Sequence, residues 1–261
     1  MNKTMIVANW KMHLNAHEAS LLVHRLDDRI KIHRDVEVVL APSMLSLQPL
    51  SLQIDRRKFR LAAQTANEHD QGAFTGEVSF TMLHDLVHYV IIGHSERRIY
   101  FHETFEVVRD KVAAAVRNKI TPILCVGETH VERKNGETKQ VLHDQLVTAL
   151  SNLTTEEVEN VVIAYEPVWA ISTFGGELAK PSQISEAVDL IRSQIRELYG
   201  ERVAASVRVL YGGSVDDHTI SGYLEVPGIN GALVGAASLN YHKFSAIIDA
   251  AYRLHHKVKE G

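Results

Sequence analysis

The chain has 261 residues, of which 45% are hydrophobic and 23% charged, a composition that excludes a disordered or membrane-embedded protein. Its 28 Lys and Arg against 32 Asp and Glu leave a net charge of −4, so no basic excess points to a nucleic-acid or acidic-membrane partner. No secretion signal or membrane span is evident, and the single cysteine, Cys125, allows no intramolecular disulfide. We therefore expect a buried Cys125 thiol in a cytoplasmic protein.

Short apolar runs recur along the whole chain. They occupy residues 5–10, 36–42, 59–64, 89–94, 121–127, 161–167, 207–213 and 231–235. Most are continuously apolar and rich in β-branched residues, which is typical of parallel strands buried on both faces. We expect each run to form one such strand.

Amphipathic segments separate these runs. Thr154 and Glu157 form a capping-box pattern, and Pro181 suits the first turn of a helix. After Pro181, five apolar residues fall on one helical stripe: Ile184, Ala187, Val188, Ile191 and Ile195. Eight strand–helix units of this kind predict an α/β protein with a single (β/α)₈ barrel domain over residues 1–261. No G-x-G-x-x-G pattern follows a strand, so the sequence does not support a dinucleotide-binding fold.

Polar and ionisable side chains lie at the ends of several predicted strands. Asn9 is near the end of the first run and Lys11 directly follows that run, while His94 lies at the end of the fourth run and Glu166 near the end of the sixth. A carboxylate after an apolar strand is costly to desolvate unless it has partners or a function. Because the carboxyl ends of barrel strands meet at one mouth, we expect these side chains to converge there.

Glycine- and serine-containing turns end the last two strands. They are Tyr211–Ser214 and Gly235–Ser238. Glycine permits close backbone approach, and N–H groups that open a helix bind anions well. Because phosphate sites after strands 7 and 8 recur in barrels, these turns predict a phosphate site.

Each of these residues has a plainer interpretation when taken alone. Lys11 would be a surface cation and Glu166 an ion-pair partner, and the glycines would only close tight loops. Their placement at corresponding strand ends favours the functional interpretation. His84 and His88 have the i, i+4 spacing of a metal pair, but no third ligand is evident, so we expect no metal site.

Seven stretches of the sequence resemble the triosephosphate isomerase family over essentially the whole chain. They are, in the family's order, ANWKMH, AAQTANEHDQGAFTGEVS, IIGHSERR, CVGE, AYEPVWAI, LYGGSV and LVGAASL. The resemblance implies a (β/α)₈ barrel that interconverts dihydroxyacetone phosphate and glyceraldehyde 3-phosphate through an enediol(ate), without a metal or organic cofactor.

The resemblance also assigns roles. It implies that Glu166 is the base, His94 the electrophile, Lys11 the fixed positive charge, and Asn9 a substrate-orienting group, with Glu96 positioning Lys11. The supporting and phosphate-binding residues are implied in the same way: Ile171 and Leu233 clamp the base, Tyr211 holds a closed lid, and Ser172, Ser214, Gly235 and Ala236 supply N–H groups to phosphate.

A homodimer is implied by the loop Gln64–Glu77. In the family this loop reaches a neighbouring subunit, so Thr75 would support Asn9 and Lys11 of the partner chain, and Glu77 would pair with its Arg98. Thr65 departs from the family, which usually has Asn at this position.

The lid segment, residues 170–179, departs further. Phe174 and Gly175 are an insertion relative to the family pattern, and Ser172 and Ala236 replace glycines. Because Ala and Ser resist positive φ, we expect an altered lid. Two alternatives follow: an isomerase for a longer substrate such as a tetrulose phosphate, or a catalytically silent phosphosugar-binding protein, whose expected sign, loss of the base or electrophile, is absent.

Overall fold

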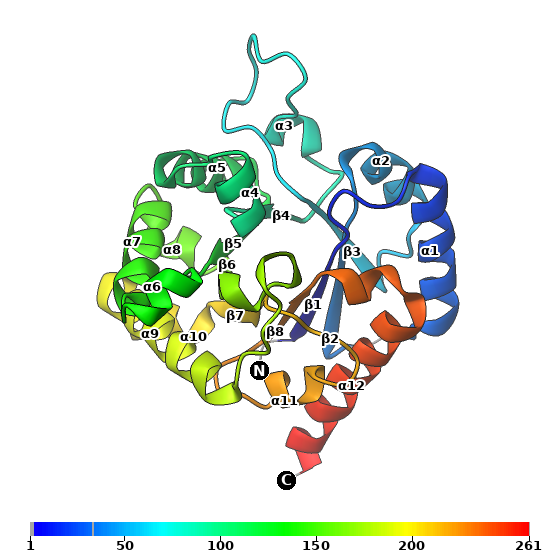
Figure 1. Ribbon diagram of the computed structural model, residues 1–261. Helices are drawn as coiled ribbons and strands as arrows, with labels where there is room; N and C mark the ends of the chain where they lie inside the picture. Colours follow the sequence, from blue (N-terminus) through cyan, green and yellow to red (C-terminus); the bar gives the residue numbers. More distant parts are fainter. Residues whose placement is uncertain (1–2, 33, 261) are drawn as a thin grey trace.

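The predicted strands close into one parallel barrel in the computed structural model, which describes residues 3–32 and 34–260, with side-chain surroundings through residue 254. Each strand pairs with the next, and β8 pairs with β1 (Figure 1). The strands are β1 (Thr4–Asn9), β2 (Val36–Ala41), β3 (Phe59–Ala63), β4 (Tyr89–Ile92), β5 (Thr121–Val126), β6 (Val162–Tyr165), β7 (Arg208–Tyr211) and β8 (Gly231–Val234). The predicted (β/α)₈ architecture is confirmed.

Helices surround the barrel (Figure 1). They are α1 (Ala16–Arg29), α2 (Met44–Gln53), α3 (Phe80–Leu83), α4 (Ser95–Tyr100), α5 (Phe105–Arg117), α6 (His130–Lys134), α7 (Thr138–Leu150), α8 (Thr155–Val158), α9 (Pro181–Tyr199), α10 (Glu201–Ser206), α11 (Ile220–Leu224) and α12 (Tyr241–Glu260). Three short 3₁₀ helices are Val168–Ala170, Ser172–Phe174 and Ala236–Leu239. As predicted, Pro181 opens α9, whose apolar stripe is buried, and Thr154 and Glu157 form the capping box of α8.

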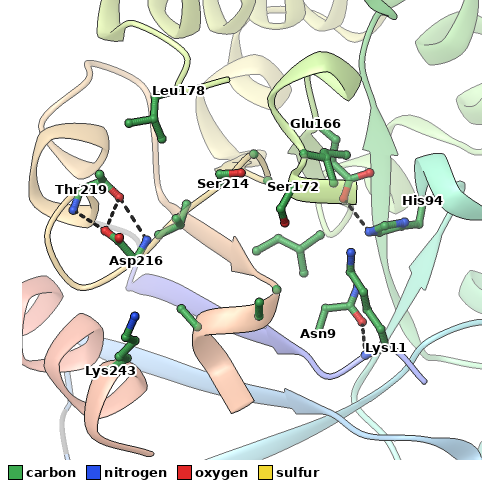
Figure 2. Close-up of a pocket in the computed structure, with 18 of the residues that line it drawn as sticks. Asn9, Lys11, His94, Glu166, Ser172, Leu178, Ser214, Asp216, Thr219 and Lys243 are labelled. Atoms are coloured by element: carbon green, nitrogen blue, oxygen red, sulfur yellow. Dashed lines mark hydrogen bonds and ion pairs between the residues drawn. The ribbon is translucent and has the colours of Figure 1, made fainter. Parts of the chain in front are cut away.

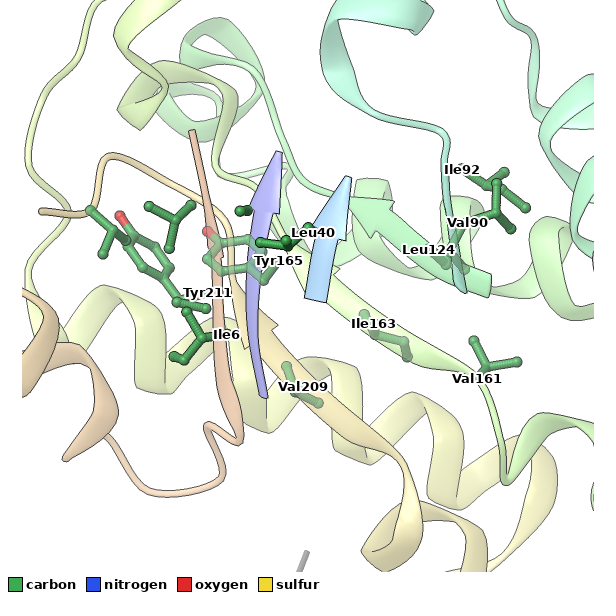
Figure 3. Packing of buried hydrophobic residues seen from close by; sticks show 14 of the residues in the cluster. Ile6, Leu40, Val90, Ile92, Leu124, Val161, Ile163, Tyr165, Val209 and Tyr211 are labelled. Atoms are coloured by element: carbon green, nitrogen blue, oxygen red, sulfur yellow. The ribbon is translucent and has the colours of Figure 1, made fainter. Parts of the chain in front are cut away.

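The apolar core has two layers because neighbouring residues of a strand point to opposite sides of the sheet. The outer layer packs between strands and helices and includes Ile6, Ile163 and Tyr165 (Figure 3). The inner layer fills the barrel and includes Val7 and Cys125. Cys125 is buried as expected, and burial raises the pKa of its thiol well above the ordinary value.

One long segment leaves the compact body of the protein. Between β3 and α3 the chain extends away from the barrel (Figure 1), and a bridge between Asn67 and Ser79 joins the two ends of this excursion. The excursion contains most of the loop Gln64–Glu77. Within the described residues, no helix is both long enough and apolar enough to cross a membrane.

Candidate active site

A cavity of about 380 Å³ lies at the carboxyl ends of the strands, where the sequence predicted the site (Figure 2). Ten of the predicted residues line it: Asn9, Lys11, His94, Glu166, Ile171, Ser172, Ser214, Leu233, Gly235 and Ala236. Glu96 and Tyr211 lie outside the lining but contact its walls. Thr75 is remote from it, on the projecting loop.

Lys11 is held in an unusual backbone conformation. Its φ is 51°, a value that residues with a side chain rarely adopt. Asn9 Oδ1 accepts the Lys11 N–H at 3.1 Å, and Gln64 Nε2 donates to the Lys11 carbonyl at 2.7 Å. The ammonium lies 2.6 Å from Glu96 Oε1, as the positioning role predicted for Glu96 requires. Such local strain is typical of functional positions whose surroundings fix them.

The proton position on neutral His94 follows from its place at the start of α4. Its Nδ1 accepts the backbone N–H of Glu96 at 3.2 Å, so Nδ1 carries no proton in that contact. In the neutral ring the proton is therefore on Nε2. Nε2 faces the cavity and lies 3.1 Å from Glu166 Oε1 (Figure 2).

Glu166 is almost completely enclosed. Only 2% of the residue is exposed, and burial raises the pKa of its carboxyl above the ordinary value, although His94 and the Ser95 N–H oppose the rise. The Ser95 N–H donates to Oε2 at 3.3 Å. Desolvation makes the carboxylate a stronger base than one in water.

Two glycines make room for this carboxylate. A Cβ on Gly127 would lie 1.9 Å from the Glu166 carbonyl oxygen, and one on Gly212 would lie 2.7 Å from Glu166 Cγ. Any side chain at either position would collide with the strand end that carries the base. Gly127 in CVGE and Gly212 in LYGGSV therefore leave the space that Glu166 occupies.

The lid segment begins at a buried anchor. Glu128 is fully buried and accepts hydrogen bonds from Trp169 Nε1 at 3.0 Å, from Arg133 at 3.0 Å and from the Tyr165 hydroxyl. The Arg133 guanidinium also lies 4.9 Å from the centre of the Trp169 ring. Sequence analysis missed this role of Glu128, although the stretch CVGE contains it. The signal available was a second carboxylate directly after a buried strand.

The two replaced glycines cause no backbone strain here. Neither Ser172 nor Ala236 has positive φ. The positive values in the lid fall on Gly175, at 148°, and Gly176, at 68°. Neither replacement therefore carries the backbone strain that the sequence suggested, and the altered lid stays a prediction.

Ser214 is engaged by the lid. Its N–H and its hydroxyl both donate to the Ala170 carbonyl, at 2.9 and 2.7 Å. The Tyr211 hydroxyl is buried beside Tyr223 without a hydrogen bond of ordinary geometry, and the Ala179 N–H lies next to it. The lid is therefore attached to the turn after β7 through Ser214, while the role of Tyr211 in holding a closed lid stays a prediction.

Other residues at the cavity escaped sequence analysis. Thr173 contacts Lys11 and Glu96, while Leu178 and Lys243 line the wall near the lid and α12. No sequence signal indicated them, because each reaches the cavity from a loop or helix start whose path the sequence does not fix.

His84 and His88 have separate partners. His88 Nε2 lies 2.8 Å from Arg60 Nη1, and His84 Nδ1 lies 3.1 Å from Asp85 Oδ2. In the part of the chain that the structure describes, no three His, Cys, Asp or Glu side chains are grouped to hold a metal ion.

A buried carboxylate, an imidazole and a lysine at one barrel mouth define an enzyme that moves protons on a small anionic substrate. The family model described as "Triosephosphate isomerase" matches residues 4–251. The triosephosphate isomerase of Clostridium tetani is 44% identical over 95% of this chain and 97% of its own length. That of Carboxydothermus hydrogenoformans is 44% identical over 95% and 98%, and that of Clostridium perfringens 43% over 95% and 100%. The chain belongs to the triosephosphate isomerase family and is an isomerase.

Proposed function

We propose that this isomerase interconverts dihydroxyacetone phosphate and D-glyceraldehyde 3-phosphate by proton transfer. In this mechanism Glu166 is the base, His94 the electrophile and Lys11 the fixed positive charge. The observation that carries the proposal is the contact of 3.1 Å between His94 Nε2 and Glu166 Oε1 in a cavity that Lys11 also lines. A base and a proton donor so close together reach adjacent carbon and oxygen atoms of one substrate.

Glu166 takes the carbon-bound proton. The Ser95 N–H holds one carboxylate oxygen, and the other faces His94 at the wall of the cavity. Ile171 and Leu233, 5% and 3% exposed, line the same cavity and keep water from the carboxylate. The proton returns to the neighbouring carbon, which leaves the enzyme unchanged and requires no cofactor.

His94 Nε2–H donates to the substrate oxygen that gains charge as the proton leaves carbon. The Glu96 N–H at the start of α4 occupies Nδ1, which leaves Nε2 as the donor directed to the cavity. Lys11 lies in the same cavity and offsets the negative charge of the enediolate. Asn9, which holds the Lys11 N–H, orients the substrate beside it.

The phosphate binds between the lid and the last two turns. Gly235 and Ala236 begin a 3₁₀ helix, and Ser172 lies across the cavity from them. Their backbone N–H groups, together with the positive charge of Lys11, suit a phosphate. Ser214 joins them when its N–H leaves the Ala170 carbonyl.

A homodimer completes the site. Large apolar side chains are exposed beside the projecting loop: Met12 at 95%, Leu45 at 87% and Met82 at 62%. Met12 directly follows Lys11, so a partner that covers it also supports the catalytic lysine. The departure at Thr65 has a local function, since its hydroxyl accepts from the buried ammonium of Lys111 at 3.2 Å.

The protein acts in glycolysis and gluconeogenesis in the cytoplasm. The reduced thiol of Cys125 is compatible with that reducing compartment.

An assay of the purified protein on glyceraldehyde 3-phosphate, coupled to reduction of the product, tests this proposal. We expect turnover of the wild type and loss of turnover in Glu166→Gln, with Glu197→Gln on the surface of α9 as a matched control. Comparing kcat/KM for triose and tetrulose phosphates tests the longer substrate. Absence of isomerisation together with retained phosphosugar binding would support the silent alternative and contradict the proposed mechanism.

A further inference from the structure

The tip of the lid contacts the catalytic lysine and its carboxylate partner. Thr173 Oγ1 donates to Glu96 Oε1 at 3.0 Å, and Lys11 Nζ lies 3.4 Å from the same hydroxyl. Glu96 Oε1 thus accepts from Lys11 and from Thr173 at once. The three side chains come from the loop after β1, from α4 and from the lid, which are far apart in the sequence and meet only in the folded barrel.

The insertion adds an apolar contact next to this polar one. The ring of Phe174 lies 5.8 Å from that of Tyr100, centre to centre, with the planes tilted by 35°. This spacing and tilt are favourable for a pair of aromatic rings. Tyr100 is the last residue of α4, the helix that carries Glu96 in its first turn. The consecutive lid residues Thr173 and Phe174 therefore contact the first and the last turn of α4.

The backbone of the tip explains why Phe174 reaches Tyr100. Residues Ser172–Phe174 form a 3₁₀ helix, and the N–H groups of Phe174 and Gly176 both donate to the Ile171 carbonyl. The chain then reverses at Gly175 and Gly176, whose φ values of 148° and 68° suit glycine. The inserted Phe-Gly pair thus supplies a ring and the flexible residue that the reversal needs.

The hydrogen bond from Thr173 is strengthened because it goes to the charged Lys11–Glu96 pair. Burial opposes ionisation of Glu96, but the hydrogen bond from Lys11, the positive charge of Lys11 and the hydrogen bond from Thr173 outweigh it, and the pKa of Glu96 is lowered. Glu96 is therefore a carboxylate at neutral pH, and hydrogen bonds to charged groups are stronger than neutral ones. With one ammonium proton directed to Glu96 and one toward Thr173, the remaining N–H of Lys11 is available to the cavity.

We propose that Thr173 and Phe174 form a clasp on α4 that positions Lys11 for the substrate phosphate. Thr173 is a positioning residue that acts through the Lys11–Glu96 pair, and Phe174 holds Thr173 in place by packing on Tyr100. The proposal rests on the role of Lys11 in phosphate binding given above. Because Lys11 attracts phosphate before and after proton transfer, the clasp should affect KM more than kcat.

Steady-state kinetics on glyceraldehyde 3-phosphate test the polar half of the clasp. Thr173→Val removes the hydroxyl at nearly constant size and should raise KM about three- to tenfold, with kcat changed by less than about twofold, as the loss of one charge-assisted hydrogen bond predicts. Thr173→Ser retains the hydroxyl and should keep the wild-type KM. Equal KM values for the two variants would overturn the proposal.

A double-mutant cycle tests the aromatic half. Phe174→Leu and Tyr100→Leu should each raise KM about two- to fivefold, and the double variant should be no worse than the poorer single variant. Tyr100→Phe keeps the ring and should match the wild type. Effects of the two single variants that multiply would show that the rings act independently and would overturn the clasp. Sedimentation of every variant confirms that assembly is unchanged.

Lys11→Met separates failure of the clasp from failure of the proposed mechanism. If this substitution leaves KM unchanged, Lys11 has no role in binding and the mechanism proposed for it is wrong. If Lys11→Met raises KM while Thr173→Val does not, the mechanism stands and the clasp is wrong.

Discussion

At the scale of single residues, the proposed role of Glu166 as base predicts that the rate depends on the reach of its side chain. Glu166→Asp withdraws the carboxylate by one methylene from a substrate that Lys11 and His94 still hold. We expect kcat to fall at least ~10²-fold with KM little changed, as small misplacements of a reacting group do. Steady-state kinetics measure both constants. Unchanged turnover would remove Glu166 from the role of base.

The raised pKa of Glu166 predicts where activity fails in acid. Protonation removes the base, so kcat/KM should fall as pH decreases through the pKa of free Glu166, which burial places above the ordinary 4.5 of a glutamate. The substrate phosphate also titrates, with a pKa of about 6. Comparing the pH–rate profiles of wild type and Glu166→Asp distinguishes the two titrations. The substitution should shift an acid limb that is due to the enzyme carboxyl and leave unshifted one that is due to the substrate phosphate. Identical acid limbs in both proteins would assign the limb to the substrate.

The raised pKa of Glu166 also makes the free energy of unfolding depend on pH. A carboxyl whose pKa is higher in the folded than in the unfolded chain binds more protons when folded between the two values. Its contribution therefore favours folding below the unfolded pKa and is lost as pH rises through the folded pKa. Glu96, whose pKa is lowered, contributes in the opposite sense: its stabilisation is present above its unfolded pKa and is lost as pH falls.

At the scale of elements, the insertion at the lid tip lies between two fixed ends. Trp169 is anchored on Glu128 before it, and Pro181 opens α9 after it. Deletion of Phe174 and Gly175 together should therefore leave triose activity within about tenfold, a barrier change of ~1.4 kcal/mol. A coupled assay on the folded variant measures it. Abolished turnover in a dimeric deletion variant would make the insertion essential for closure, and a large gain for triose over tetrulose phosphate would favour the longer substrate.

The elements differ in how far the sequence determined them. The strands were predictable because burial on both faces requires continuous apolar runs, and α9 because its stripe and Pro181 are local signals. Short helices such as α10 and α11 have no comparable periodicity. The approach of Lys11, His94 and Glu166 followed from the barrel rule that strand ends share one mouth. The contact of Thr173 with Glu96 did not, because it joins the lid to the first turn of α4, 77 residues apart, and the path of the lid depends on tertiary packing.

At the scale of the whole molecule, the projecting loop and the exposed side chains beside it predict assembly. Figure 1 places α2, α3 and α4 around the base of this loop, on the side of the barrel where Leu45 and Met82 are exposed. A subunit interface would cover exposed apolar side chains of this kind. Lys11, with its unusual φ, lies directly before exposed Met12, so a partner loop at this place would restrain the catalytic lysine.

The wild type should therefore sediment at about twice the mass of the chain at micromolar concentration. Thr75→Arg, which places a large charged side chain in the projecting loop, should shift the protein toward monomer and lower kcat/KM at least ~10-fold, because Lys11 and Asn9 lose their support. Ser193→Arg introduces the same side chain on an exposed position of α9 and should leave mass and activity unchanged. Sedimentation and kinetics on the same samples give both readouts. A monomeric Thr75→Arg protein with full activity would show that each barrel works alone, and that Thr75 does not complete the site of a partner.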